Sequence, residues 1–218
     1  MSKAAQVKAP WLNSRDPGVP ATLTYSELSM CGRVEEMVRR YPDYIAYEFM
    51  GKETDYATFL RRVDLTARAF VAMGIHRGDR VTICMPNSPQ GVDCFYALNR
   101  IGAIPNMIHP LSAPHEIAFY LNVSHSKAIL TLDQFYYKVE QILPDLQDTC
   151  RIIIARIQDE LPGVKKALFP LTKTARAVQK LPKTGYLLWN DFLNAGRRSK
   201  RNCLPTKACT MTAAPFST

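Results

Sequence analysis

The amino-acid sequence predicts an α/β protein in which helices cover a parallel sheet, a three-layer architecture. Apolar segments of about four to six residues alternate with helical patterns of about ten residues from position 80 onward. Glycine, proline, asparagine and aspartate stand between these segments and supply the turns. The chain of 218 residues is 47% hydrophobic and 22% charged, so it can bury the core of one domain.

The first elements precede this alternation. Residues 1–30 are polar and interrupted by prolines, so we expect an extended N-terminal arm. A helix over 32–41 should end at the Pro42-Asp43 pair. The segment Ile45–Phe49 is predicted to be a strand, with a tight turn and a short return strand near Tyr56.

A longer helix is expected over residues 57–73, because apolar side chains recur there at helical spacing. Gly74 follows as the residue at which a left-handed backbone ends the helix without strain. The apolar face consists of Phe59, Leu60, Val63, Ala67, Phe70 and Val71. The other face carries Arg61, Arg62, Asp64 and Arg68.

The alternating part of the chain follows directly. Short apolar segments predict strands over 80–85, 104–108, 128–132 and 152–155. Helical patterns between and after them cover 90–101, 114–123 and 134–143. Strands that alternate with helices in this way are typical of βαβ units, which form parallel sheets.

Residues 164–181 form a less regular, basic amphipathic segment. Val164, Leu168, Leu171, Ala175 and Val178 share one helical stripe, and lysines and arginines flank it. We expect a helix docked on its own domain, although Pro170 interrupts the hydrogen-bond ladder. The alternative is peripheral contact with an anionic membrane surface through 164–181. Short elements at 186–189 and 191–194 complete the part of the chain that is expected to fold.

The net charge of +9 is concentrated in the C-terminal tail. Residues 196–218 contain five basic residues and no acidic one, which leaves 23 basic against 19 acidic residues in the rest of the chain. The excess is therefore a property of an irregular basic tail and makes no basic recognition face, so we expect no nucleic-acid partner.

Other composition features exclude several protein classes. No run of about 18 apolar residues exists to cross a membrane. Residues 1–30 lack the apolar stretch of a secretory signal, so we expect a cytoplasmic protein. The six cysteines make no C-x-x-C pair and no zinc-ligand pattern with histidine, and are expected to be reduced and buried.

The sequence contains few candidate catalytic residues. Phosphate-binding glycine motifs, H-E-x-x-H and G-x-S-x-G are all absent. Of the four histidines, His109 is the best candidate to face a cleft, because it follows a strand end and ligands bind there in open α/β sheets. Asn87 and Ser88 also follow a strand, but an N-cap of the next helix is the favoured role.

A set of short motifs in consistent order resembles the N-terminal subdomain of adenylate-forming enzymes. The matching segments are Gly74-Ile75-His76-Arg77-Gly78-Asp79-Arg80-Val81, Met85-Pro86-Asn87-Ser88-Pro89-Gln90, Arg100-Ile101-Gly102-Ala103 and His109-Pro110-Leu111. Upstream, Pro10-Trp11-Leu12, Gly18-Val19-Pro20 and Leu23-Thr24-Tyr25 are similar to the leader of bacterial long-chain fatty acid–CoA ligases. The resemblance covers roughly residues 10–195.

This resemblance implies an AMP-forming ligase that joins a fatty acid to coenzyme A, using ATP and Mg²⁺. It also implies that the domain is incomplete, since the phosphate loop S-G-T-T-G-x-P-K-G has no counterpart here. The family's Mg²⁺-binding glutamate, ribose-binding aspartate and catalytic lysine are absent too. We therefore assign residues 31–195 to a partial AMP-binding domain with no catalytic, cofactor-binding or metal residue. We expect the fragment itself to bind no cofactor.

Two interpretations of the tail at 196–218 stay open. One is a native disordered tail, given its basic and then Ala/Thr/Pro-rich composition. The other is a shift of the reading frame or a truncation. In the frame shifted by two bases, codons for residues 207–218 allow G-M-H-D-D-C-G-A-I-L-Y, which resembles the strand before the family's phosphate loop.

The sequence thus supports two main functional hypotheses. The first is an N-terminal fragment of a fatty acid–CoA ligase that is inactive alone. The second is a degenerate synthetase subdomain that binds a partner or a membrane surface. Self-association is expected for an isolated fragment, because a parallel sheet needs cover on both faces and missing chain would supply part of it.

Overall fold

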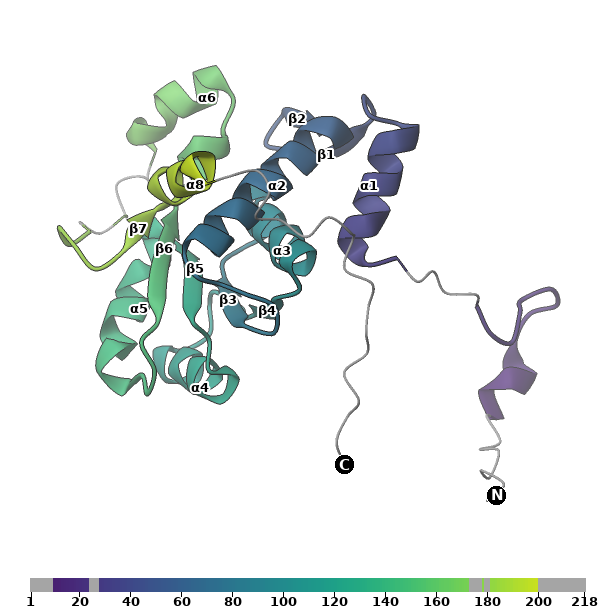
Figure 1. Cartoon of the computed structure of the whole chain (residues 1–218), viewed down its shortest axis with the longest axis horizontal. Coiled ribbons are helices and arrows are strands. Elements are labelled where there is room, and N and C mark those ends of the chain that lie inside the picture. The colour runs from purple at the N-terminus through teal and green to yellow at the C-terminus, as the bar shows by residue number, and fades with distance from the viewer. Residues whose placement is uncertain (1–9, 24–27, 173–177, 179–180, 200–218) are drawn as a thin grey trace.

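The computed structural model describes residues 10–23, 28–172, 178 and 181–199. A 3₁₀ turn, η1 (Pro10–Ser14), lies in the N-terminal arm, and the first helix is α1 (Met30–Arg40). Strands β1 (Ile45–Phe49) and β2 (Lys52–Asp55) then form an antiparallel hairpin. Figure 1 shows that η1 stands apart from the body of the molecule.

The 17-residue helix α2 (Tyr56–Ala72) begins where the hairpin ends. Asp55 caps it, because its carboxylate accepts the backbone N–H of Thr58 at 2.6 Å. The return strand predicted near Tyr56 therefore ends one residue earlier, and Tyr56 already belongs to the helix. Gly74, with a φ of +85°, follows the helix as predicted.

The centre of the molecule is a five-stranded sheet in the order β4-β3-β5-β6-β7, and every pair in it is parallel. Its strands are β3 (Arg80–Cys84), β4 (Ile104–Met107), β5 (Ala128–Leu132), β6 (Arg151–Ala155) and β7 (Leu187–Leu188). The predicted α/β class and parallel sheet are confirmed.

The connecting helices also match the predicted order. They are α3 (Pro89–Ile101), α4 (Pro114–Ser124), α5 (Tyr136–Ile142) and α8 (Trp189–Arg198). Short 3₁₀ turns occur at η2 (Asp133–Phe135), η3 (Leu143–Asp145) and η4 (Ile157–Glu160). The helix predicted over 134–143 is thus divided among η2, α5 and the start of η3.

Two apolar clusters place helices on opposite faces of the sheet. The larger cluster joins side chains of α1, α2, α3 and α8 to the strand residues Val81, Ile83, Leu130 and Ile153. The smaller one joins α4 and α5 to the strand residues Ile129, Ile152 and Ile154. Alternate residues along one strand therefore point to opposite faces of the sheet. Helices cover both faces, and Figure 1 shows this three-layer architecture.

This covering differs from the open sheet face expected from the sequence. The central strands β3, β5 and β6 are buried on both faces, apart from the first residues of β3 and β6, Arg80 and Arg151. Exposed apolar side chains lie instead at the sheet edges, at Ile104 and Met107 of β4 and Leu187 of β7. The expectation of an uncovered face is wrong, because α2, α3 and α8 pack on one face of the central strands and α4 and α5 pack on the other.

Two further expectations need correction. Helix α8 continues to Arg198, so residues 196–198, assigned to the irregular tail, are helical. Gly196 is buried there, and a Cβ built on it would lie 2.6 Å from the backbone oxygen of Leu65. The remaining tail, 200–218, lies outside the described residues, and so does the proposed frame shift in it.

The predicted helix over 164–181 is much shorter. Helix α6 (Gly163–Leu168) ends before the 3₁₀ turn η5 (Phe169–Leu171), because Pro170 cannot continue the ladder. The apolar stripe of the described part is in solvent rather than docked: Val164, Leu168 and Leu171 are 76%, 55% and 68% exposed. Residues 173–177 and 179–180 lie outside the described residues.

Candidate functional site

The carboxyl edge of the sheet is the place where ligands bind in open α/β folds. Four loops meet at this edge, one after each of the strands β3, β4, β5 and β6. They begin at Met85, Ile108, Asp133 and Arg156. Both positions singled out from the sequence, the 86–89 loop and His109, belong to this edge.

The loop after β3 serves to start a helix. The hydroxyl of buried Ser88 accepts the backbone N–H of Gly91 at 3.4 Å, and Pro89 occupies the first turn of α3. The predicted N-cap role is therefore confirmed for Ser88, whereas Asn87 is exposed. A small cavity of about 130 Å³ opens beside this loop, and its walls include Met85, Phe95 and Met107.

A buried lysine of α5 holds the loop after β4 in place. Nζ of Lys138, on α5, donates to the backbone oxygens of Pro110 at 3.0 Å and Ser112 at 2.7 Å. His109 is exposed, and its Nδ1 accepts the backbone N–H of Leu111 at 3.2 Å. His109 thus shapes its own turn, and it does not line the cavity at this edge.

No motif in the sequence predicts a structural role for Lys138. Its neighbours on the inner face of α5, Tyr136, Val139 and Ile142, are buried, so Lys138 stands among apolar side chains. A charged residue in such a position signals a buried partner. The sequence does not predict the carbonyl groups that Lys138 binds, because they lie 26 to 28 residues away in the chain.

The loops after β5 and β6 meet each other. Nε of Arg156 lies 3.9 Å from Oδ2 of Asp133, and Nε2 of Gln90 donates to the backbone oxygen of Arg156 at 3.0 Å. Burial raises the pKa of Asp133, although the N–H of Gln134 and the charge of Arg156 work in the opposite direction. These contacts join α3 to the carboxyl ends of β5 and β6 and hold the two loops in place.

A buried ion network lies next to this edge, between α2, α3 and η4. The guanidinium of Arg62 donates to Asp93 at 2.8 Å and to both oxygens of Glu160 at 2.6 and 2.9 Å. Lys52 of the hairpin lies 3.6 Å from Glu160. The assignment of Arg62 to the outer face of its helix is therefore wrong, because its partners come from distant parts of the chain.

The network carries one carboxyl group with an unusual titration. Burial raises the pKa of Asp93 to about 7 and outweighs the attraction of Arg62. One oxygen of Asp93 and the hydroxyl of Tyr47 are buried without a hydrogen-bond partner among the described residues. Burial also raises the pKa of Tyr47 to about 12. The carboxyl group of Asp93 lies between α2, α3 and η4, and through Arg62 it helps to hold these three elements together.

The described residues do not fit a metal centre. No group of three or more His, Cys, Asp or Glu side chains in the described part of the chain could hold an ion. Mg²⁺ needs oxygen ligands in octahedral geometry, and at the carboxyl edge Asp133 is already engaged by the N–H of Gln134 and by Arg156. We therefore derive no catalytic step through Mg²⁺ from these residues.

Three of the four described cysteines, Cys31, Cys84 and Cys94, are buried as predicted, whereas Cys150 is only partly buried. Burial raises the pKa of Cys31 and Cys84 to about 11 and that of Cys150 to about 12, so they stay protonated at neutral pH. All four described cysteines are free thiols. Cys203 and Cys209 lie outside the described residues.

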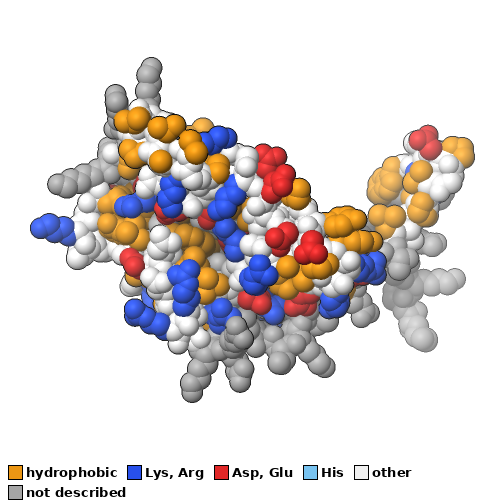
Figure 2. All heavy atoms as spheres, turned by 90° about the horizontal axis from the view of Figure 1, so that it is seen from above, with side chains coloured by type: hydrophobic (Ala, Val, Ile, Leu, Met, Phe, Trp, Pro, Cys, Tyr) orange, Lys and Arg blue, Asp and Glu red, His pale blue; other side chains and the backbone are white. Residues whose placement is uncertain are grey.

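The surface mixes charges of both signs. On the face that Figure 2 shows, Lys and Arg side chains alternate with Asp and Glu and with apolar side chains. Within the described residues, no helix has the length and apolar character needed to cross a lipid bilayer.

Comparisons with known proteins agree with this fold. The chain is 28% identical over 199 residues to the long-chain-fatty-acid–CoA ligase of Bacillus subtilis, covering 91% of this chain and 35% of the relative. It is 30% identical over 200 residues to the ligase of the same description from Escherichia coli O157:H7, covering 88% of this chain and 35% of the relative. The chain thus spans about a third of the length of these curated relatives.

Solved structures show the same fold. A fatty acyl CoA synthetase of Mycobacterium tuberculosis matches with a TM-score of 0.60 at 19% identity, over 83% of this chain and 30% of that one. A benzoate CoA ligase from Burkholderia xenovorans LB400 matches with a TM-score of 0.59 at 16% identity, over 83% and 30% of the two chains. The sequence family described as AMP-binding enzyme matches residues 34–197. This chain therefore belongs to the AMP-binding, adenylate-forming enzyme family.

Proposed function

We propose that this chain is the N-terminal part of an ATP-dependent fatty acid–CoA ligase and is inactive alone. The observation that carries this proposal is the match to long-chain-fatty-acid–CoA ligases over about nine tenths of the chain but only about a third of each relative. The leader motifs at Pro10-Trp11-Leu12 and Gly18-Val19-Pro20 support the long-chain assignment.

The chemistry of such a ligase explains why this part is insufficient. A carboxylate is a poor acyl donor until its oxygen attacks the α-phosphorus of ATP and expels pyrophosphate. The thiol of coenzyme A then attacks the acyl carbon and releases AMP. Charge on the transferred phosphoryl group needs a backbone cradle, cations and Mg²⁺. The chain's sequence has no such glycine-rich cradle, so its proposed role is to supply the scaffold of the first subdomain.

The carboxyl edge supplies the structural support for this role. Ser88 starts α3, Lys138 holds the loop after β4, and Arg156 joins the ends of β5 and β6. These contacts fix four loops at one edge of the sheet without a substrate. In the proposed ligase the edge forms one wall of the active site, and the remaining wall and the catalytic groups come from later chain.

Fatty-acid-dependent ATP–pyrophosphate exchange tests the proposal. Chain 1–218 alone should show no exchange above a blank. The product of a gene continued after codon 206 in the frame shifted by two bases should exchange with palmitate at least ten times faster than with benzoate. Exchange by chain 1–218 itself would contradict the inactive role. A benzoate preference in the repaired product would contradict the substrate class.

The alternative function is a surface-binding subdomain that contacts a membrane through 164–181. The exposure of Val164, Leu168 and Leu171 beside Lys165 and Lys166 favours it. Sedimentation with vesicles containing anionic lipid tests this role. Leu168→Gln should then release the chain from the vesicles, whereas Leu143→Gln, at another exposed leucine, should not.

We also propose that the isolated chain self-associates through the β4 side of the sheet. Ile104 and Met107 on this edge strand, and Phe119 and Val123 on α4, are exposed apolar side chains. An open parallel edge with apolar neighbours favours pairing. Sedimentation velocity should show a weight-average mass that rises with concentration, and Met107→Lys should reduce it. A concentration-independent monomer would contradict this proposal.

A further inference from the structure

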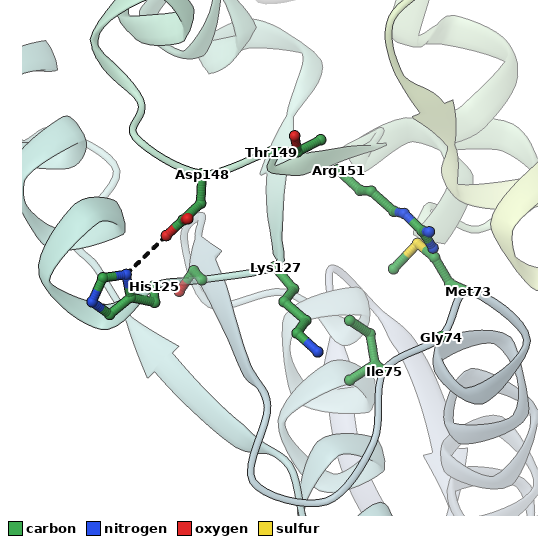
Figure 3. Close-up of a pocket in the computed structure, with 9 residues that line it drawn as sticks. Met73, Gly74, Ile75, His125, Lys127, Asp148, Thr149 and Arg151 are labelled. Carbon is green, nitrogen blue, oxygen red and sulfur yellow. Dashed lines mark hydrogen bonds and ion pairs between the residues drawn. The ribbon is translucent and has the colours of Figure 1, made fainter.

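A pocket of about 540 Å³ lies at the amino edge of the sheet, opposite the carboxyl edge described above. Three chain segments form it, at the entries to β3, β5 and β6. Figure 3 shows Lys127 and Arg151 extending toward the 73–75 segment, and His125 and Asp148 facing each other on the other side. None of these residues has a role in the function proposed above.

The two cations of the pocket are placed differently. Nζ of Lys127 lies 2.7 Å from Asp79, a carboxylate outside the lining, which also accepts the backbone N–H of His76 at 2.8 Å. Burial opposes ionisation of Asp79, but the hydrogen bonds from Lys127 and His76 prevail and lower its pKa. Lys127 is therefore held in one position by a fixed counter-charge, with two further N–H donors left on its ammonium group.

Arg151 has no such partner. Within the described part of the chain, its guanidinium makes no ion pair with a carboxylate and no hydrogen bond. One guanidinium nitrogen lies 3.9 Å from the position that a Cβ on Gly74 would take. The guanidinium of Arg151 thus lies within van der Waals distance of the turn into β3.

The one acidic side chain in the lining is already engaged. Oδ2 of Asp148 lies 2.8 Å from Nδ1 of His125, which ends α4 in the left-handed conformation. The lining also includes the exposed Thr149 and an apolar floor at Met73 and Ile75, whereas the hydroxyl of Ser126 is already hydrogen-bonded to Thr82 and Ser124. Asp148 is thus engaged by His125 and Lys127 by Asp79, which leaves Arg151 as the cation of the lining that has no carboxylate partner among the described residues.

We propose that this pocket binds a small soluble phosphomonoester, with its phosphate between Lys127 and Arg151. A guanidinium is a planar fork of N–H donors that matches two phosphate oxygens, and an ammonium adds a point charge. Ligand pockets typically measure about 300–1,000 Å³, so this one has room for an organic group as well as the phosphate. The Met73 and Ile75 floor is the surface against which that organic group would lie.

Equilibrium dialysis of chain 1–218 with labelled ribose 5-phosphate tests this inference at fixed ionic strength. Binding should be saturable, and inorganic phosphate should displace the label whereas ribose should not. Arg151→Gln should weaken binding at least tenfold. Thr149→Glu, which places a carboxylate in the pocket at an exposed position, should abolish it. Arg39→Gln removes an exposed cation of α1 and should leave the affinity unchanged.

Each result bears on the site. Equal weakening by Arg151→Gln and Arg39→Gln would reduce the effect to net charge and overturn the proposal. Displacement by ribose, or binding that Thr149→Glu leaves intact, would also overturn it. The test does not depend on ligase activity, so failure of the proposed function leaves its result unaffected. Both pocket substitutions are at exposed residues, and circular dichroism checks that each variant is folded.

Discussion

The two faces of the sheet are stabilised by different parts of the chain. The cluster under α2, α3 and α8 joins residues from Cys31 to Phe192 and adjoins the buried network of Arg62. The cluster under α4 and α5 draws its buried side chains from Cys84 to Ile154. The first face thus depends on contacts between the two ends of the folded part, whereas the second is assembled from neighbouring βα units. A substitution in the first face should therefore lower the free energy of unfolding of the whole folded part.

The largest expected effect removes the centre of the ion network. Arg62→Ala leaves Asp93 and Glu160 without their shared cation, and breaking a buried pair costs about 3–5 kcal/mol. Urea unfolding should show this loss. Arg61→Ala on the same helix is the matched control, since Arg61 is exposed and, among the described residues, its side chain hydrogen-bonds only to Thr58. This variant should change stability by less than about 0.5 kcal/mol. Similar losses for both variants would contradict a special role of the network.

The same network should make stability depend on pH. Because Asp93 has a pKa of about 7 when folded and near 3.8 when unfolded, the unfolded chain releases its proton first as pH rises. The contribution of this group to the free energy of unfolding should therefore fall between about pH 4 and 7, by up to about 4 kcal/mol, and then level off. Denaturation across this range should show a smaller fall for Asp93→Asn than for the wild type. Equal slopes would contradict the raised pKa.

Two neighbouring isoleucines compare the faces directly. Ile153 points into the larger cluster and Ile154 into the smaller one, and both are fully buried. Truncation of a buried isoleucine to alanine costs about 2–5 kcal/mol, depending on how far the surroundings relax. We expect Ile153→Ala to lose more stability than Ile154→Ala, because helices from both ends of the folded part hold its surroundings. A larger loss for Ile154→Ala would reverse the comparison.

A smaller effect is expected where α8 crosses α2. Gly196→Ala would place a methyl group 2.6 Å from the oxygen of Leu65 and 2.8 Å from the nitrogen of Ala69. The helices must separate, and overpacking of this kind costs about 1–3 kcal/mol. Gly163→Ala is the control, because no atom of the described residues lies within 4 Å of its added carbon. Thermal unfolding that treats both variants alike would argue against close packing of α8.

Local patterns predicted most of the fold. Strands Ile45–Phe49 and Ala128–Leu132 have the predicted bounds, and the apolar positions Phe59, Val63, Ala67 and Phe70 of α2 are buried. Each of these signals lies within one segment of the chain, where hydrophobic spacing and turn residues are sufficient.

Contacts between distant segments could not be predicted in the same way. Arg62 looked like a solvent-facing residue, because its partner Glu160 is 98 residues away. Gly196 looked like the start of a tail, because only the packed α2 helix explains a glycine there. The carboxyl-edge loops were located correctly, but Lys138, which holds one of them, has no motif.

Both faces of the sheet are thus formed within the described residues. We propose that this chain is the first part of a longer ligase. The nucleotide sequence of the locus, from codon 190 to several hundred bases beyond codon 218, tests it most directly. We predict that the frame shifted by two bases continues into codons for a Ser/Gly/Thr-rich phosphate loop. An in-frame stop after Thr218 with no ligase-coding sequence downstream would contradict it.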